Sequence, residues 1–219
     1  MSSAAAAVAT SSEPMTAPIQ AYVEHTIEEL LASLPDTAQL SADERRGILA
    51  RYTAVLEGNF IYWMTGAYLA VGTDEARAKI IDNLREEVRD SHPDMLRRFA
   101  IAADAMPREG DTDAVYRSLT DMRLFIGRLS PVPIVVTMAF FEGFIQRFMP
   151  YLADLAKRQG SAEMEYTDVH GVCDVTHTQE LYRALDAEMA LASPIAAEEL
   201  FEGVGRLRAL LRTIVLNHN

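Results

Sequence analysis

The sequence has little cysteine and no long apolar run. Cys173 is its single cysteine, so an intrachain disulfide framework and a cysteine-rich zinc or iron–sulfur site are both excluded. A membrane-spanning helix needs about 20 consecutive apolar residues. The longest candidate here, Pro131–Phe141, is shorter and is followed directly by Glu142. We therefore expect a cytoplasmic protein that does not act in a membrane.

Basic residues are scarce as well. The chain has 20 Lys and Arg against 32 Asp and Glu, which gives a net charge of −12. Nucleic acids and anionic membranes both bind basic surfaces, so neither is expected as the main partner. The first 18 residues are mostly Ala, Ser and Thr without Lys or Arg, so they lack the charged start of a targeting signal. We expect residues 1–18 to be a disordered tail and residues 19–219 to form a single domain.

The sequence is rich in segments whose apolar residues recur with the 3.6-residue period of a helix. Ser41 is a candidate N-cap, because it begins the sequence Ser-Ala-Asp-Glu. A helix break is expected at Pro93, and Ser91-His92-Pro93-Asp94 resembles a second capping box. The expected fold class is all-α, a seven-helix bundle with short connections. The predicted helices cover residues 19–33, 41–71, 74–106 with the break at Pro93, 111–128, 131–158, 162–191 and 194–216.

His170, Asp174 and His177 give the strongest indication of chemistry. On a helix these positions share one face, so two imidazoles and a carboxylate point the same way. Such a set suits a divalent first-row metal, and iron in particular when coordination positions stay open. A polar helix face with two ordinary histidines is the alternative. Because the chain has only five histidines, the metal interpretation is favoured.

Two glutamates lie in largely apolar helical segments. Glu57 shares a predicted helix face with residues such as Ala54 and Phe60, and Glu142 is surrounded in the sequence by apolar residues. A buried carboxylate without a partner is costly, so both are candidate metal ligands. The alternative is that each reaches solvent or pairs with an arginine, as Glu142 could with Arg147.

Further candidates flank the break at Pro93. Glu87 and His92 are five residues apart, a spacing that a continuous helix does not align, but the break allows His92 to turn toward Glu87. Either Glu87 or Glu86 could supply the carboxylate of this segment. The alternative is a solvated acidic face with His92 acting only near the start of the next helix. Since His92 lies beside a break, we expect the metal position that uses it to be the weaker one.

Taken together, four predicted helices each present a carboxylate or a carboxylate–histidine group, and a bundle core is where facing helices can join them. The four carboxylates Glu57, Glu87, Glu142 and Asp174 would balance two divalent cations. A ferritin-like scaffold is disfavoured, because the chain has no Glu-x-x-His motif.

These residues resemble the heme-oxygenase-like di-iron oxidases and oxygenases over residues 40–191. The most specific part of the resemblance is His-x-x-x-Asp-x-x-His on a late helix. The resemblance implies a seven-helix heme-oxygenase-like fold, two Fe(II) ions per chain and O2 as co-substrate, but no single reaction. The ligands that it implies are Glu57, Glu87 or Glu86, His92, Glu142, His170, Asp174 and His177.

We therefore expect an O2-dependent non-heme di-iron oxidoreductase that oxidises a small carboxylic-acid or amino-acid-derived metabolite by fragmentation, decarboxylation or N-oxygenation. An external electron donor is compatible with this chemistry, and a homodimer stays open. One alternative is an enzyme with a single iron at His170, Asp174 and His177. The other is a metal-free helical protein with a binding or regulatory role.

Overall fold

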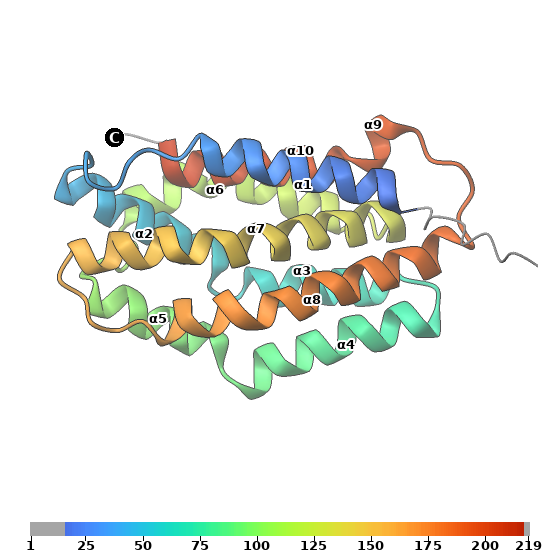
Figure 1. The fold of residues 1–219 in the computed structure, drawn as a ribbon, viewed down its shortest axis with the longest axis horizontal. Coiled ribbons are helices and arrows are strands. Elements are labelled where there is room, and N and C mark those ends of the chain that lie inside the picture. Colours follow the sequence, from blue (N-terminus) through green and yellow to red (C-terminus); the bar gives the residue numbers. More distant parts are fainter. Residues whose placement is uncertain (1–15, 217–219) are drawn as a thin grey trace, which may run out of the picture.

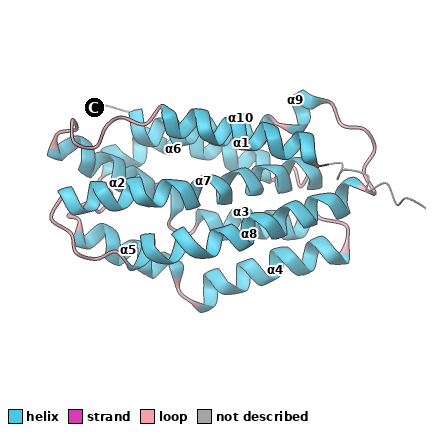
Figure 2. Ribbon diagram, viewed as in Figure 1, coloured by secondary structure: helices cyan, strands magenta, loops and turns pink. Residues whose placement is uncertain are grey.

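The computed structural model describes residues 16–216, except for the side chains of residues 173 and 174. Every regular element in this part of the chain is a helix (Figure 2). The all-α expectation is confirmed. The predicted tail lies outside the described residues up to residue 15. Helix bounds are α1 Ala17–Ala32, α2 Ala42–Leu56, α3 Asn59–Ala70, α4 Asp74–Arg89, α5 His92–Ala102, α6 Glu109–Ile126, α7 Pro131–Arg158, α8 Glu165–Met189, α9 Ala197–Leu200 and α10 Glu202–Leu216.

The described helices number ten rather than seven because three of the predicted helices are divided. The segment expected to run continuously from residue 41 to 71 is broken where Gly58 adopts a φ of +81°, a conformation that glycine tolerates best. The last predicted helix is divided at Phe201 into α9 and α10. The break near Pro93 occurs as predicted, between α4 and α5.

The two predicted capping boxes have different outcomes. At the start of α2, the backbone N–H of Glu44 donates to the Ser41 hydroxyl, and the backbone N–H of Ser41 donates to the Glu44 carboxylate, so this box is confirmed. At the start of α5, Ser91 has a φ of +56° and its side chain caps no backbone group. The second box was wrong, because the sharp left-handed turn that redirects the chain moves the Ser91 hydroxyl away from the first turn.

Helix α7 is the central element of the bundle (Figure 1). It contacts α1, α2, α3, α8 and α10, and almost all of its first half is buried. By length and composition it could cross a membrane, but 89% of its most apolar window lies inside the protein. We therefore identify α7 as a core helix, whose apolar surface is covered by its neighbours.

Buried carboxylates join several of the helices through polar contacts. The buried Glu188 near the end of α8 accepts hydrogen bonds from the backbone N–H groups of Gly72 and Thr73 and from the Thr73 hydroxyl. Because Thr73 also caps α4, this contact fixes the start of α4 against the end of α8. On another side of the bundle, Arg46 of α2 donates two hydrogen bonds of 3.0 Å to the buried Asp111 of α6.

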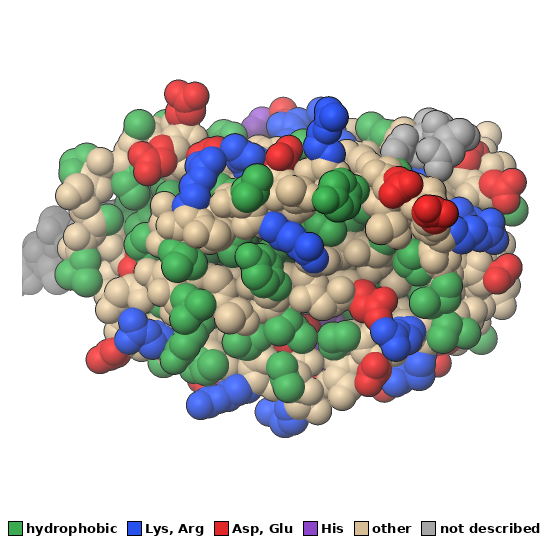
Figure 3. All heavy atoms as spheres, turned by 180° about the vertical axis from the view of Figure 1, so that it is seen from behind, with side chains coloured by type: hydrophobic (Ala, Val, Ile, Leu, Met, Phe, Trp, Pro, Cys, Tyr) green, Lys and Arg blue, Asp and Glu red, His purple; other side chains and the backbone are tan. Residues whose placement is uncertain are grey.

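The surface carries acidic, basic and apolar side chains close together. On the face seen in Figure 3, Lys and Arg side chains are interspersed with Asp, Glu and hydrophobic ones and form no continuous basic area.

Candidate metal centre

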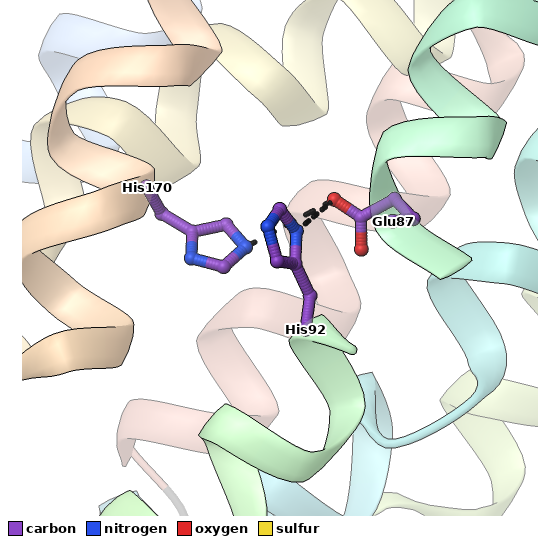
Figure 4. A group of neighbouring side chains, drawn as sticks. All are labelled: Glu87, His92 and His170. Carbon is purple, nitrogen blue, oxygen red and sulfur yellow. Dashed lines mark hydrogen bonds and ion pairs between the residues drawn. The ribbon is translucent and has the colours of Figure 1, made fainter. Parts of the chain in front are cut away.

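Glu87, His92 and His170 form the first group of candidate ligands (Figure 4). One potential ligand atom from each lies within 4.8 Å of those of the other two. His92 Nδ1 lies 2.7 Å from Glu87 Oε1, and the His92 and His170 ring centroids are 4.5 Å apart. All three residues are buried, with exposed fractions of 5%, 5% and 6%. We call these residues the first ligand group.

The helix break brings Glu87 and His92 together. Helix α4 ends at Arg89, the chain turns through Ser91, and His92 becomes the first residue of α5. The imidazole can then turn back toward the end of α4, which a continuous helix would prevent at this spacing. The predicted reorientation of His92 is therefore confirmed.

Tyr166 holds the imidazole of His170 from one turn earlier on α8. His170 Nδ1 lies 2.8 Å from the Tyr166 carbonyl oxygen, which can only accept, so Nδ1 carries the proton. The other nitrogen, Nε2, lies 4.0 Å from Glu87 Oε1 and has the lone pair that a metal needs. The Tyr166 ring packs against the imidazole of His170, with ring centroids 4.3 Å apart. The Tyr166 hydroxyl forms a buried 2.7 Å hydrogen bond with the hydroxyl of Tyr52.

His177, Glu142 and Glu86 form what we call the second ligand group. His177 lies two turns after His170, so it meets different partners. Its Nε2 lies 3.0 Å from Glu86 Oε2, and its Nδ1 lies 3.8 Å from Glu142 Oε1. His177 and Glu142 are each 3% exposed, whereas the Glu86 side chain is 42% exposed.

Asn83 was missed by the sequence analysis. Its side-chain amide donates a 2.7 Å hydrogen bond to Glu142 Oε1. Asn83 lies one turn before Glu87 on α4, so the two share the buried face of that helix. A buried Asn in phase with a candidate ligand was the available signal, but its partner on α7 depends on packing. Arg147, the alternative partner of Glu142, pairs with Glu24 instead.

Glu57 is not part of either group. Glu57 is the C-cap residue that follows α2, and its carboxylate accepts hydrogen bonds from the Nε and Nη2 atoms of Arg97, which raise the pKa of that guanidinium. Asp174 lies on α8 between His170 and His177, but its side chain lies outside the described residues.

Two cavities reach the ligand groups from different sides. One contacts Glu87, His92, His170 and Glu142 and is otherwise mainly apolar. The other is a charged cleft between α4 and α8. Its lining residues are Asp82, Arg85, Glu86, Arg89, Thr176, His177 and Glu180.

Iron fits this chemistry. Imidazole and carboxylate are ligands that Fe(II) accepts, and the described part of the chain brings both together in the buried Glu87, His92 and His170. Glu87 is a buried carboxylate that lies beside the imidazole rings of His92 and His170. A bound cation would offset the cost of burying that charge.

The fold and the buried Glu/His/His group define an all-helical protein with a candidate metal site in its core. The chain matches the family model described as iron-containing redox enzyme over residues 24–212. It therefore belongs to the iron-containing redox enzyme family. The predicted family is confirmed. A comparison with curated proteins gives no match.

Proposed function

We propose that this member of the family is a non-heme di-iron oxidase or oxygenase that uses O2 to oxidise a small carboxylic-acid or amino-acid-derived metabolite. The observation that carries the proposal is the presence of two ligand groups, each with carboxylate and imidazole, of which the first group and Glu142 line one apolar cavity. Family membership supports iron as the metal.

The ligands divide between two iron positions in this proposal. Glu87, His92 and His170 hold the first iron. His177 contributes one ring nitrogen to the second, and because Nε2 faces Glu86 while Nδ1 faces Glu142, one of these two carboxylates shares that iron with it. Asp174, on the same helix between the two histidines, remains a proposed ligand, as does Glu57. The separate partners of His170 and His177 favour this arrangement over a single iron held by His170, Asp174 and His177.

The protein's own residues orient the ligands and exclude water. Tyr166 fixes the protonated nitrogen of His170, and Asn83 orients Glu142 by donating to its carboxylate. Apolar residues including Leu56, Phe60 and Phe141 line the cavity, so a substrate group there is shielded from solvent. When bound by these ligands, iron would supply the electrons that reduce O2 and the oxidising power for the substrate. Turnover would draw further electrons from an external donor.

Anaerobic Fe(II) titration tests the proposal, with iron measured by elemental analysis and O2 consumption followed afterwards. We expect about two Fe(II) per chain in the wild type. Glu142→Gln keeps the size of the side chain and removes one ligand charge, so it should keep its helical circular dichroism but lose tight binding of one iron. One iron in the wild type would favour the single-iron alternative, and trace iron would favour the metal-free one. Normal iron binding and O2 consumption in Glu142→Gln would remove Glu142 from the site.

A further inference from the structure

Asn83 is a buried amide of which only one half has a partner. The residue is 3% exposed and lies on the buried face of α4. Its Nδ2 atom donates the 2.7 Å hydrogen bond to Glu142 Oε1, whereas its Oδ1 atom has no hydrogen-bond partner among the described residues. A buried carbonyl oxygen that accepts nothing has lost its hydration without compensation, so it requires a physical explanation.

Glu142 determines which way this amide is turned. The oxygens of an ionised carboxylate only accept hydrogen bonds, so the donor atom Nδ2 must be the one that meets Oε1. Rotating the amide by half a turn would bring two acceptors together and would satisfy neither of them. The atom of Asn83 without a partner is therefore its oxygen, which is suited to accept a hydrogen bond or to bind a cation.

Asn83 is a neighbour of carboxylates from both ligand groups. Glu86 and Glu87 follow it by three and four residues on α4, the spacing at which side chains of a helix are neighbours. Glu142 lies across from it on α7. When ionised, none of these three carboxylates can donate a hydrogen bond to Oδ1. A cation bound among them would satisfy the carboxylates and the amide oxygen together.

The amide oxygen lies within reach of an ion that binds Glu142. Because Oδ1 and Nδ2 of Asn83 share one carbon atom and Nδ2 lies 2.7 Å from Glu142 Oε1, the two oxygens are at most about 5 Å apart. Two ligand atoms of one divalent ion, each bound at about 2.1 Å, lie up to about 4 Å apart. A modest side-chain rotation therefore brings both oxygens onto one ion, and carbonyl oxygen is a ligand that divalent cations accept.

Asn59 shows what a buried Asn with a purely structural role looks like in this fold. Its side-chain amide donates a 2.7 Å hydrogen bond to the carbonyl of Val55, and its Oδ1 atom accepts a 2.9 Å hydrogen bond from Arg123 Nε. Both halves of that amide have partners. Asn83 is as deeply buried, but its oxygen has no such contact within the part of the chain that the structure describes.

We propose that Asn83 is a further metal ligand, which binds through Oδ1 the same iron as Glu142 while its Nδ2 atom holds the Glu142 carboxylate in place. The amide and the carboxylate then serve the ion as a hydrogen-bonded pair that carries one negative charge. The proposal rests on the proposed function only in placing an iron beside Glu142. Since the added ligand is neutral, the expected balance of four carboxylates against two divalent cations is unchanged.

Exchanging the two side chains tests the proposal. Asn83→Asp combined with Glu142→Gln keeps the total charge and an amide–carboxylate hydrogen bond, but it moves the carboxylate from α7 to α4. If both positions reach the ion, the exchanged pair should restore the tight Co(II) binding that Glu142→Gln alone loses, to within about tenfold of the wild type. Anaerobic calorimetric titration of the full chain with Co(II) measures the affinities, and circular dichroism checks the fold.

Two leucine variants complete the comparison. Asn83→Leu removes the amide with little change in size, and it should weaken one of the two Co(II) sites by about 10- to 100-fold, the range seen when a group that supports a metal site is lost. Asn59→Leu is the matched control, because it removes an equally buried amide whose partners are both structural. It should leave both Co(II) affinities unchanged.

An exchanged pair that binds Co(II) no better than Glu142→Gln would overturn the proposal, as would wild-type affinities in Asn83→Leu. If the exchanged pair does not fold, Asn83→Asp alone decides. It keeps an oxygen ligand at position 83 and should bind Co(II) at least as tightly as the wild type, so weaker binding would count against the proposal. Two Co(II) ions in the wild type without rescue by the exchange would overturn this inference and leave the proposed function standing. Rescue in a chain that consumes no O2 after loading with Fe(II) would do the reverse.

Discussion

The two ligand groups contain the same kinds of side chain but differ in their access to water. All three residues of the first group are buried, and they line an apolar cavity. The second group has two buried members, but Glu86 is half-exposed and lies with His177 in a charged cleft. In the proposed site, one metal position would therefore have only buried ligands, and the other would have a ligand that reaches solvent.

Two adjacent residues of α4 produce much of this difference. Successive residues of a helix point about 100° apart. Glu87 therefore enters the core beside His92, while Glu86 turns toward the cleft and His177. The sequence left open whether Glu86 or Glu87 is the candidate ligand. In the structure each contacts a different histidine, Glu87 the buried His92 and Glu86 the imidazole of His177.

The comparison also revises the expected order of metal affinity. Proximity to the helix break suggested that the position using His92 would be the weaker one. His92 is instead buried and bonded to Glu87. Solvent access through the cleft makes the second position the better candidate for rapid metal exchange.

The largest expected effect comes from removing either histidine of α8. His170→Ala should weaken metal binding at the first position by about 100-fold or more, since loss of groups that merely orient a ligand already costs about 10- to 100-fold. His177→Ala should do the same at the second position. Anaerobic titration with Co(II), followed by calorimetry and visible absorbance, should give one tight site in each variant. If either variant lost both sites while keeping its helical circular dichroism, the two groups would have to be a single site.

A change at Glu188 should affect both groups alike, because this residue joins α4 to α8. Glu188→Gln should lower the free energy of unfolding by about 2 kcal/mol at neutral pH through loss of charge-assisted hydrogen bonds. Urea denaturation measures this value, and Co(II) titration measures the two affinities. Selective loss of one metal position would show that Glu188 does not act on the pair of helices as a unit.

The pH dependence follows from the contacts of Glu188. Burial alone would raise its pKa, but hydrogen bonds from Thr73 and Gly72 outweigh burial and hold the pKa of Glu188 below its ordinary value of 4.5. The stabilisation is therefore fully present above pH 4.5 and is lost as the pH falls through the folded-state pKa. The difference in unfolding free energy between the wild type and Glu188→Gln should shrink over that acidic range. A difference that stays constant there would contradict the assignment.

The smallest expected effect concerns the rate of metal loss, and it distinguishes the two ligand groups most directly because it separates the role of Glu86 from that of Glu87. Removal of Co(II) by excess EDTA should occur in two phases, and we assign the faster to the second position. Glu86→Gln should accelerate the fast phase by roughly tenfold, as expected for loss of one partly exposed charged contact. Glu87→Gln should instead accelerate the slow phase. A single phase in the wild type, or the same phase changed by both variants, would remove the distinction between the two groups.

Much of the fold could be predicted because it depends on local patterns. Helical periodicity gave the all-α class, and the proline at position 93 indicated the break that brings His92 to Glu87. The break after Leu56 was missed, because a single glycine is often tolerated within a helix. Here Glu57 leaves helical geometry with a ψ of 101°, and the Asn59 side chain donates to the carbonyl of Val55. Nothing in the local pattern identifies that contact.

The candidate site could be predicted as a set of residue types but not as a set of contacts. His170 and His177 were expected on one helix face, and they are. Their separate partners depend on how α4 and α7 pack against α8, which a single sequence does not encode locally. The same holds for the Arg97–Glu57 pair, which joins residues 40 positions apart.

The buried position of α7 has a consequence for how the chain must be made. During synthesis, α7 leaves the ribosome before α8 and α10, two of the helices that cover it. The nascent chain therefore carries an apolar helix of membrane-spanning length that is only partly sheltered by the helices already made. Such a surface invites self-association or capture by chaperones. Since α8 carries His170 and His177, the next helix to cover α7 would also complete the two proposed metal positions.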